Sequence, residues 1–220
     1  MTTLALLHTG TFLASVFTDL CHEAMPDVEV FNMVDESLIK NTIKANQVTP
    51  QTARRLVDHL KSAEEAGADA ILVTCSSIGP AVEAAQQFLN IPVIRVDVPL
   101  ADKAIGIGSR IGVVATLPTT LKPTVELIEA RAKLAGKEID VVSTLCEGAF
   151  QAVAAGDTET HDRLVTAGIR ALMAKVDVIV LAQASMARAA NAIPEEERTV
   201  PILSSPQLAV DATQEVIRKL

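Results

Sequence analysis

Cys75 is the residue whose type and position best suit chemistry. It lies between the apolar run 70–73, which predicts a buried strand, and a predicted helix that begins near Ser77 or Pro80. At such a turn the unpaired N–H groups of the helix lower the pKa of a thiol and favour the reactive thiolate. The same N–H groups and nearby hydroxyls suit an anion such as a carboxylate; the hydroxyls belong to Thr74, Ser76 and Ser77. The alternative is an unreactive buried cysteine, which is common in proteins.

Other candidate groups are fewer and scattered along the chain. His8 ends the first predicted strand at the same sheet edge as Cys75, so it is either a proton donor near neutral pH or a hydrogen-bonded structural histidine. Cys146 follows another predicted strand and is a weaker candidate, whereas Cys21 lies inside a predicted helix and is expected in the core. Arg95 is expected to be a solvated surface charge.

The cysteine spacing also bears on compartment. The three cysteines are far apart, with no C-x-x-C pair and no metal-ligand spacing, so neither a disulfide framework nor a metal site is expected. Reduced thiols fit a cytoplasmic protein. The first residues show no signal-peptide pattern, and no apolar run is long enough to span a membrane.

Composition excludes several classes of partner. The 220 residues carry a net charge of −8, which is opposite to what binding a nucleic-acid backbone requires. With five Phe and neither Trp nor Tyr, the chain can build no stacking platform for single-stranded nucleic acid and no aromatic cage. We therefore expect a small-molecule ligand, and neither a nucleic acid nor a membrane as partner.

The elements that position these residues are strands alternating with helices. Short, continuous apolar runs are typical of strands buried on both faces of a parallel sheet, and eight occur, at 4–7, 28–34, 70–73, 92–96, 111–114, 139–142, 176–181 and 201–203. Between them, helical periodicity is clearest at 53–65 and 119–134, which end before Gly67 and Gly136. The pattern predicts an α/β fold with helices on both faces of the sheet.

An internal repeat divides the chain. The segment 67–77 matches 175–185 at an offset of 108 residues, which places Ile71 on Ile179 and Ser77 on Ser185. The same offset places 4–9 on 112–117. We predict two related α/β lobes, 1–105 and 106–220, with the C-terminal helix crossing to the first lobe and a ligand cleft between the carboxyl ends of their sheets. The alternative is the general likeness of any two α/β units.

Three segments in this order resemble the aspartate/glutamate/hydantoin racemase superfamily: Val73-Thr-Cys-Ser-Ser77, Ile91-Pro-Val-Ile94 and Arg110-Ile-Gly-Val-Val-Ala-Thr116. The resemblance extends over nearly the whole chain. It implies two pseudo-symmetric flavodoxin-like lobes, and an enzyme that uses no cofactor and acts at the carbon next to the carboxylate of a small amino or hydroxy acid. It also implies a homo-oligomer, most simply a dimer.

The resemblance further implies roles for individual residues. Racemases of this family use one cysteine from each lobe, and the first of these maps to Cys75, with Ser76 and Ser77 as carboxylate-binding neighbours. In the second lobe the carboxylate-binding segment maps to Ala115, Thr116 and Thr119, with Thr120 adjacent, and the repeat adds Ser185 opposite Ser77.

The second cysteine position is occupied by Gln183, which has no titratable proton. Three interpretations stay open. Water or His8 completes a racemisation begun by Cys75; or the chain is a single-cysteine decarboxylase or cis–trans isomerase of a small dicarboxylate, in which Gln183 holds a carboxylate or enediolate; or it binds carboxylates without catalysis. The scarcity of aromatic residues favours a small aliphatic substrate.

Overall fold

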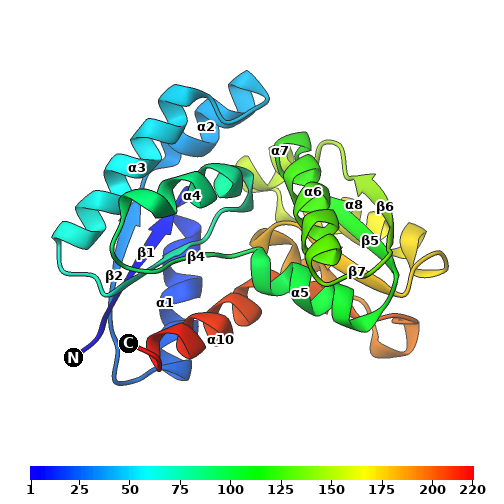
Figure 1. The fold of residues 1–220 in the computed structure, drawn as a ribbon. Coiled ribbons are helices and arrows are strands. Elements are labelled where there is room, and N and C mark those ends of the chain that lie inside the picture. The colour runs from blue at the N-terminus through cyan, green and yellow to red at the C-terminus, as the bar shows by residue number, and fades with distance from the viewer. The chain divides into compact units, whose positions relative to one another are not determined.

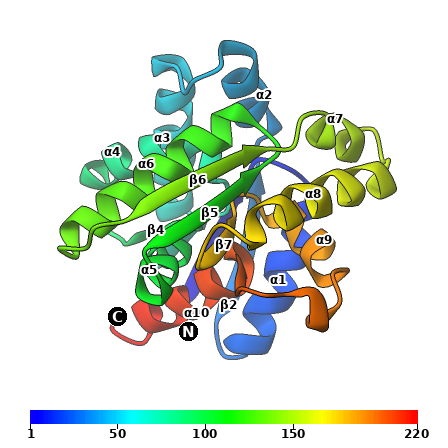
Figure 2. The same ribbon diagram turned by 90° about the vertical axis from the view of Figure 1, so that its right-hand side faces the viewer.

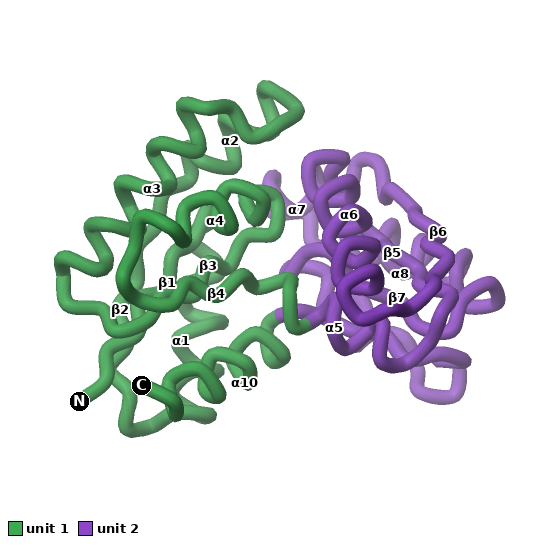
Figure 3. Tube along the Cα trace, in the orientation of Figure 1, with its two compact units in different colours: residues 1–99, 206–220 green, residues 100–205 purple.

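The chain folds into two compact α/β units. The computed structural model describes residues 1–220 and divides them into unit 1, residues 1–99 with 206–220, and unit 2, residues 100–205 (Figure 3). Each unit contains one four-stranded, wholly parallel sheet. The predicted fold class, two related parallel-sheet lobes, is therefore confirmed.

The unit 1 sheet has the strand order β2-β1-β3-β4. Its strands are β1 (Thr3–His8), β2 (Glu29–Val34), β3 (Ala70–Val73) and β4 (Val93–Arg95). The inner strand β3 is buried along its whole length and β1 is buried after its first residue, whereas the edge strand β2 is partly exposed. The continuous apolar runs of the sequence thus mark the inner strands, whose two faces are both covered.

Helices cover both faces of this sheet (Figure 1). One face packs its alternate residues, among them Leu7 and Ile71, against apolar residues of α2, α3 and α4. On the other side lie α1 and α10, where the Gln214 side chain donates a hydrogen bond to the Ala24 carbonyl. The helices of unit 1 are α1 (Phe12–Ala24), α2 (Glu36–Ala45), α3 (Pro50–Glu65), α4 (Gly79–Ala85) and α10 (Ser205–Ile217), with short 3₁₀ helices η1 (Ser76–Ile78) and η2 (Gln86–Phe88).

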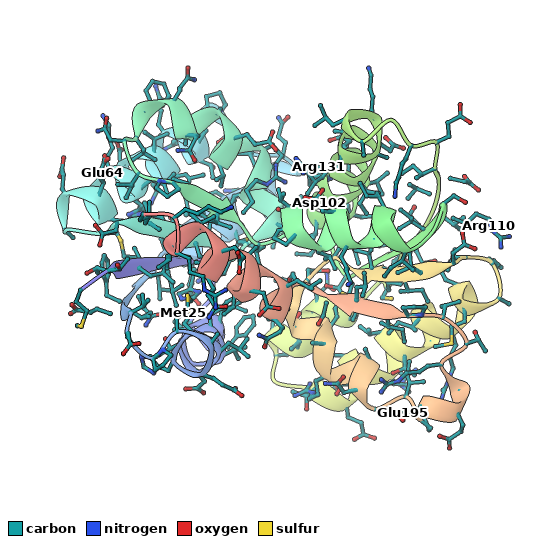
Figure 4. All side chains as sticks on the ribbon, turned by 60° about the horizontal axis from the view of Figure 1, so that its bottom comes forward. Met25, Glu64, Asp102, Arg110, Arg131 and Glu195 are labelled. Carbon is teal, nitrogen blue, oxygen red and sulfur yellow. The ribbon has the colours of Figure 1, made fainter.

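Unit 2 repeats this plan with the order β6-β5-β7-β8. Its strands are β5 (Arg110–Ala115), β6 (Asp140–Leu145), β7 (Val178–Leu181) and β8 (Ile202–Ser204). Its helices are α5 (Val98–Ile107), α6 (Pro118–Leu134), α7 (Ala149–Ala154), α8 (Thr158–Met173) and α9 (Ala187–Asn191), with 3₁₀ helices η3 (Ala184–Met186) and η4 (Glu195–Glu197). Figure 2 shows α6 and α8 on opposite sides of the sheet. The guanidinium of Arg131 in α6 binds both carboxylate oxygens of Asp102 in α5, and Figure 4 labels the pair.

The strand registers show the repeat at the level of hydrogen bonds. Leu4 pairs with Ala70 in unit 1, and Ile111 pairs with Val178 in unit 2. The offset is therefore 108 residues between β3 and β7 but 107 between β1 and β5, one less than the sequence comparison assigned. Both long helices stop where expected, because Gly67 and Gly136 adopt positive φ angles of 94° and 66° that other residues rarely take.

The helix that follows the last strand of each unit belongs to the other unit. Helix α5 follows β4 of unit 1 but belongs to unit 2 from Leu100 onward, and α10 follows β8 of unit 2 but belongs to unit 1 from Pro206. The division therefore falls at 99/100, whereas the sequence analysis placed it at 105/106. No helix in the structure has the length and apolar character that crossing a bilayer requires.

Candidate functional site

Cys75 lies in the turn between the buried strand β3 and the 3₁₀ helix η1. Its backbone is still extended, with φ −125° and ψ 113°, and its side chain is half-buried. The sulfur receives hydrogen bonds from the backbone N–H groups of Ser77 and Ile78, and it is also hydrogen-bonded to the Thr9 side chain at the end of β1. The turn therefore surrounds one thiol with three polar groups that stabilise negative charge.

The protonation state of this thiol differs from the expectation. Burial raises the pKa of Cys75, and the nearby charge of Asp97 raises it further, whereas the hydrogen bonds of Thr9, Ser77 and Ile78 lower it. The net direction is upward, which favours the protonated thiol. The N–H groups act in the predicted sense, but desolvation of the charged form outweighs them.

His8 lies beside this turn with no exposed surface. Its Nδ1 is 2.7 Å from the Thr74 hydroxyl and its Nε2 is 2.8 Å from the Asn32 side-chain oxygen. The Thr74 hydroxyl also donates to the Leu7 carbonyl at 3.2 Å, so in a neutral ring with Nε2–H donating to Asn32 its single hydrogen is shared between that carbonyl and Nδ1. Burial lowers the pKa of His8, while the bond to Asn32 opposes this shift. These contacts favour the structural interpretation, and a catalytic role for His8 stays a prediction.

Gln183 occupies the same turn in unit 2, between β7 and η3. Its side-chain oxygen accepts the Thr116 N–H at 2.7 Å, and its side-chain nitrogen donates to the Thr116 hydroxyl at 2.6 Å. Because that hydroxyl accepts from Gln183, its own hydrogen is left to donate elsewhere. Gln183 thus orients Thr116 as a hydrogen-bond donor and offers no titratable proton itself.

The two turns are built alike around different side chains. With the observed offset of 107 for the first strands, Thr9 corresponds to Thr116, and each threonine contacts the residue at the end of the neighbouring inner strand. A uniform offset of 108 would pair Thr9 with Leu117, so the correspondence of the two threonines is not apparent from the sequence repeat. A repeat of Thr9 in Thr116 was the signal that could have found the role of Thr9.

The other predicted binding residues lie near these two turns, each in its own unit. Thr119, at the start of α6, is 8% exposed and its buried hydroxyl has no hydrogen-bond partner. Such an unpaired hydroxyl is costly unless a ligand or water satisfies it. Unit 1 brings together Cys75, His8, Thr74, Ser76 and Ser77, and unit 2 brings together Gln183, Thr116, Thr119, Thr120 and Ser185. No group of three or more His, Cys, Asp or Glu side chains is arranged to hold a metal ion.

Arg95 is not the surface charge that was expected. It is 7% exposed and its guanidinium binds both carboxylate oxygens of Asp97, which is itself 3% exposed. The sequence missed this pair because a charge after a strand is usually solvated, and only the fold shows which side of the strand it covers.

The other two cysteines are core residues. Cys21 is fully buried in α1, and burial raises its pKa to about 11. Cys146 is 6% exposed, belongs to the apolar core of unit 2, and lies against Gly168 of α8. Burial also raises the pKa of Cys146. All three cysteines are free thiols.

The contact between Cys146 and Gly168 leads to a prediction on stability. A Cβ at Gly168 would lie 2.6 Å from the Cys146 sulfur, so Gly168→Ala is expected to destabilise unit 2 by about 1–2 kcal/mol. In a Cys146→Ala background the same change is expected to be neutral or stabilising, because the sulfur is gone and alanine favours a helix. Urea unfolding of the four proteins measures the coupling. Equal effects of Gly168→Ala in both backgrounds would contradict the packing argument.

Comparison with known proteins agrees with this architecture. Residues 8–213 match the model of the Asp/Glu/hydantoin racemase family, and no curated protein matches the chain.

Among solved structures, a glutamate racemase isoform from Bacillus anthracis is similar, with a TM-score of 0.75 and 19% identity over 99% of this chain and 82% of its own. An allantoin racemase from Klebsiella pneumoniae has a TM-score of 0.71 and 20% identity over 100% and 89%. An aspartate racemase from Picrophilus torridus has a TM-score of 0.70 and 15% identity over 100% and 94%. At these identities the structures show a shared fold, and the family match over 8–213 shows that the chain belongs to the Asp/Glu/hydantoin racemase family.

Proposed function

We propose that this chain is a racemase or isomerase that needs no cofactor and transfers a proton at the carbon next to the carboxylate of a small amino or hydroxy acid. Cys75 is the acid–base group. The observation that carries the proposal is the set of hydrogen bonds on its sulfur from Thr9, Ser77 and Ile78, because these groups stabilise the thiolate that proton transfer creates.

The serine residues of this turn favour a carboxylate ligand beside the thiol. Ser76 and Ser77 are nine-tenths or more buried in the turn and are the carboxylate-binding residues that the family resemblance implies. In unit 2 the hydroxyls of Thr116, Thr119 and Thr120, with Ser185 close by, take the corresponding role. A substrate oxygen would satisfy the unpaired hydroxyl of Thr119.

In the proposed reaction, a base-form thiolate at Cys75 takes the α-proton, and the electron pair is delocalised into the carboxylate as an enediolate. Return of a proton from the thiol restores the starting enantiomer, and a proton from a donor on the opposite face of the enediolate gives the other enantiomer. Gln183 has no proton to give, so the second donor is water or His8. Because burial raises the pKa of Cys75, binding of the substrate has to be coupled to loss of the thiol proton.

A second candidate is a single-thiol decarboxylase or cis–trans isomerase of a small dicarboxylate. The hydrogen bonds between Gln183 and Thr116 favour it, because a fixed donor in place of a second thiol suits binding of a carboxylate or a developing enediolate. In the decarboxylase reaction, the Cys75 thiol protonates the carbanion that forms when carbon dioxide is lost. In the isomerase reaction, the Cys75 sulfur adds to the double bond, the new single bond rotates, and elimination of the sulfur restores the double bond.

Proton NMR in heavy water, combined with chiral chromatography of the products, distinguishes these outcomes. A panel of small amino acids, hydroxy acids, malonates and maleate is incubated with the full chain, and the α-hydrogen signal and the products are followed. We expect loss of the α-hydrogen signal and formation of both enantiomers for at least one amino or hydroxy acid. Exchange without inversion, carbon dioxide release or maleate isomerisation would support the second candidate. Binding without any reaction would contradict both and identify a carboxylate-binding protein.

A further inference from the structure

A buried ion pair lies next to the turn that holds Cys75. The Arg95 guanidinium, at the end of β4, donates from Nε to one Asp97 oxygen at 2.9 Å and from Nη2 to the other at 2.8 Å. Its third nitrogen, Nη1, pairs with Glu83 of α4, whose side chain is 62% exposed. Arg95 and Asp97 are 7% and 3% exposed, so both charges are almost completely removed from water.

The guanidinium packs directly on the backbone of this turn. A Cβ at Gly79 would lie 2.5 Å from Nη2 and 2.7 Å from Cζ of Arg95, so any larger residue there would displace the guanidinium or the turn. The Gly79 N–H donates to the Ser76 carbonyl and closes η1, the turn whose Ser77 and Ile78 N–H groups bind the Cys75 sulfur. Arg95 therefore supports the backbone that carries the donors to the thiol.

Unit 2 serves as an internal control for what the fold requires. At the positions equivalent to Cys75, Gly79, Glu83 and Arg95 it has Gln183, Ala187, Asn191 and Ser204. The same strand, 3₁₀ turn and short helix form there without any of these charges. The charged network thus accompanies the thiol and is not needed to build the turn.

Burying an arginine and an aspartate is costly, and apolar residues of similar volume commonly stabilise a fold as well or better. We propose that Arg95 and Asp97 are positioning residues for Cys75: the guanidinium holds the thiol-bearing turn in place and balances the Asp97 charge beside the sulfur. The proposal rests on the role of Cys75 proposed above and adds the residues that set the reactivity of its thiol.

The charges around the sulfur can be enumerated from the elements that meet there. Asp97 raises the pKa of Cys75, Arg95 opposes the Asp97 charge, and Glu83 binds Arg95 from the solvent side. His8 of β1 lies near the turn, and burial lowers its pKa. Removing the positive charge of Arg95 therefore leaves Asp97 unbalanced, and removing the negative charge of Asp97 leaves Arg95 paired with Glu83 alone.

The test is the pH dependence of thiol alkylation in the full chain. Iodoacetamide labelling of Cys75 is followed by mass spectrometry of its peptide, which separates it from Cys21 and Cys146. Arg95→Met is expected to move the midpoint up by about one pH unit, a tenfold slower reaction at a fixed pH below it. Asp97→Asn is expected to move it down by a similar amount, and Arg95→Lys, which keeps the charge, to leave it near the wild-type value.

Matched controls separate this effect from general damage. Arg131→Met removes another arginine–aspartate pair, the one with Asp102 in unit 2, and is expected to leave the midpoint unchanged. If Arg95→Met does not fold, Asp97→Asn alone decides, because Arg95 keeps its Glu83 partner. Wild-type midpoints in every folded variant would overturn the proposal. Alkylation needs no substrate, so shifted midpoints in a chain without turnover would contradict the proposed function and not this inference.

Discussion

Cys75→Ala is expected to abolish turnover while leaving the fold intact. The side chain is half-buried at the end of β3 and packs against the margin of the unit 1 core, so removing its sulfur is expected to cost little stability. Loss of the acid–base group removes the rate enhancement that such groups supply, about 10²–10⁴-fold. Turnover is measured with the substrate found by deuterium exchange, and folding by thermal unfolding monitored by circular dichroism.

Cys146→Ala is the matched control for this experiment. It removes a thiol from a comparable strand-end position, but one that lies in the core of unit 2 against Gly168. We expect lower stability and unchanged kcat and KM for this variant. Activity of Cys75→Ala within a few-fold of wild type would remove Cys75 from the mechanism, and loss of activity in Cys146→Ala alone would assign the chemistry to the other cysteine.

Asp35→Ala is expected to destabilise the protein by about 3 kcal/mol at neutral pH. Asp35 is 9% exposed at the end of β2. Its carboxylate caps α2 by accepting a hydrogen bond from the Ser37 N–H, and it also accepts hydrogen bonds from Arg55 and His59 of α3. The variant loses three hydrogen bonds to a largely buried carboxylate, each worth about 1 kcal/mol. Urea unfolding at pH 7 measures the change, and the exposed Asp58→Ala is the control, expected within about 0.5 kcal/mol of wild type.

The pH dependence of the same difference is a stricter test. Burial raises the pKa of Asp35, but the bonds from Ser37, His59 and Arg55 outweigh it and hold the pKa well below its usual range. A carboxyl whose pKa is lower in the folded state stabilises the protein fully above its unfolded pKa of about 3.9, and this contribution is lost as the pH falls through the folded value. The gap between wild type and Asp35→Ala is therefore expected to stay constant from pH 7 to 5 and to shrink below about pH 4. A gap that changes between pH 7 and 5 would contradict the assignment of this pH dependence to the Asp35 carboxyl.

Much of the fold follows from local patterns in the chain. The eight apolar runs mark all eight strands, and the four inner strands are the most continuously apolar because both of their faces are covered. Gly67 and Gly136 end their helices because both take positive φ angles. The repeat predicted two related units, and the registers show them. A crossing of the C-terminal helix to the first lobe was also expected, but the assignment of α5 to unit 2 depends on packing between elements far apart in sequence.

The candidate site was predictable in position and less so in chemistry. Placing Cys75 and Gln183 at equivalent strand ends required only the periodicity of the strands and the repeat. Thr9 was missed because the offset of its strand is 107 and not 108. The direction of the Cys75 pKa shift was not predicted, because the pKa of a thiol depends on how much water reaches it, and spacing along the chain carries no measure of desolvation.

By itself the sequence determined the α/β class, the two-unit repeat, the family and the place of the Cys75 thiol at a strand end, since each of these follows from the order and spacing of residue types. Only the tertiary structure decided the upward pKa shift of Cys75 and the downward pKa shift of His8. It also decided the hydrogen bond from Gln183 to Thr116 and the burial of Arg95 with Asp97. These depend on which groups from distant parts of the chain exclude water from one another, and electrostatic free energies change with that exclusion more than with any other feature of the site.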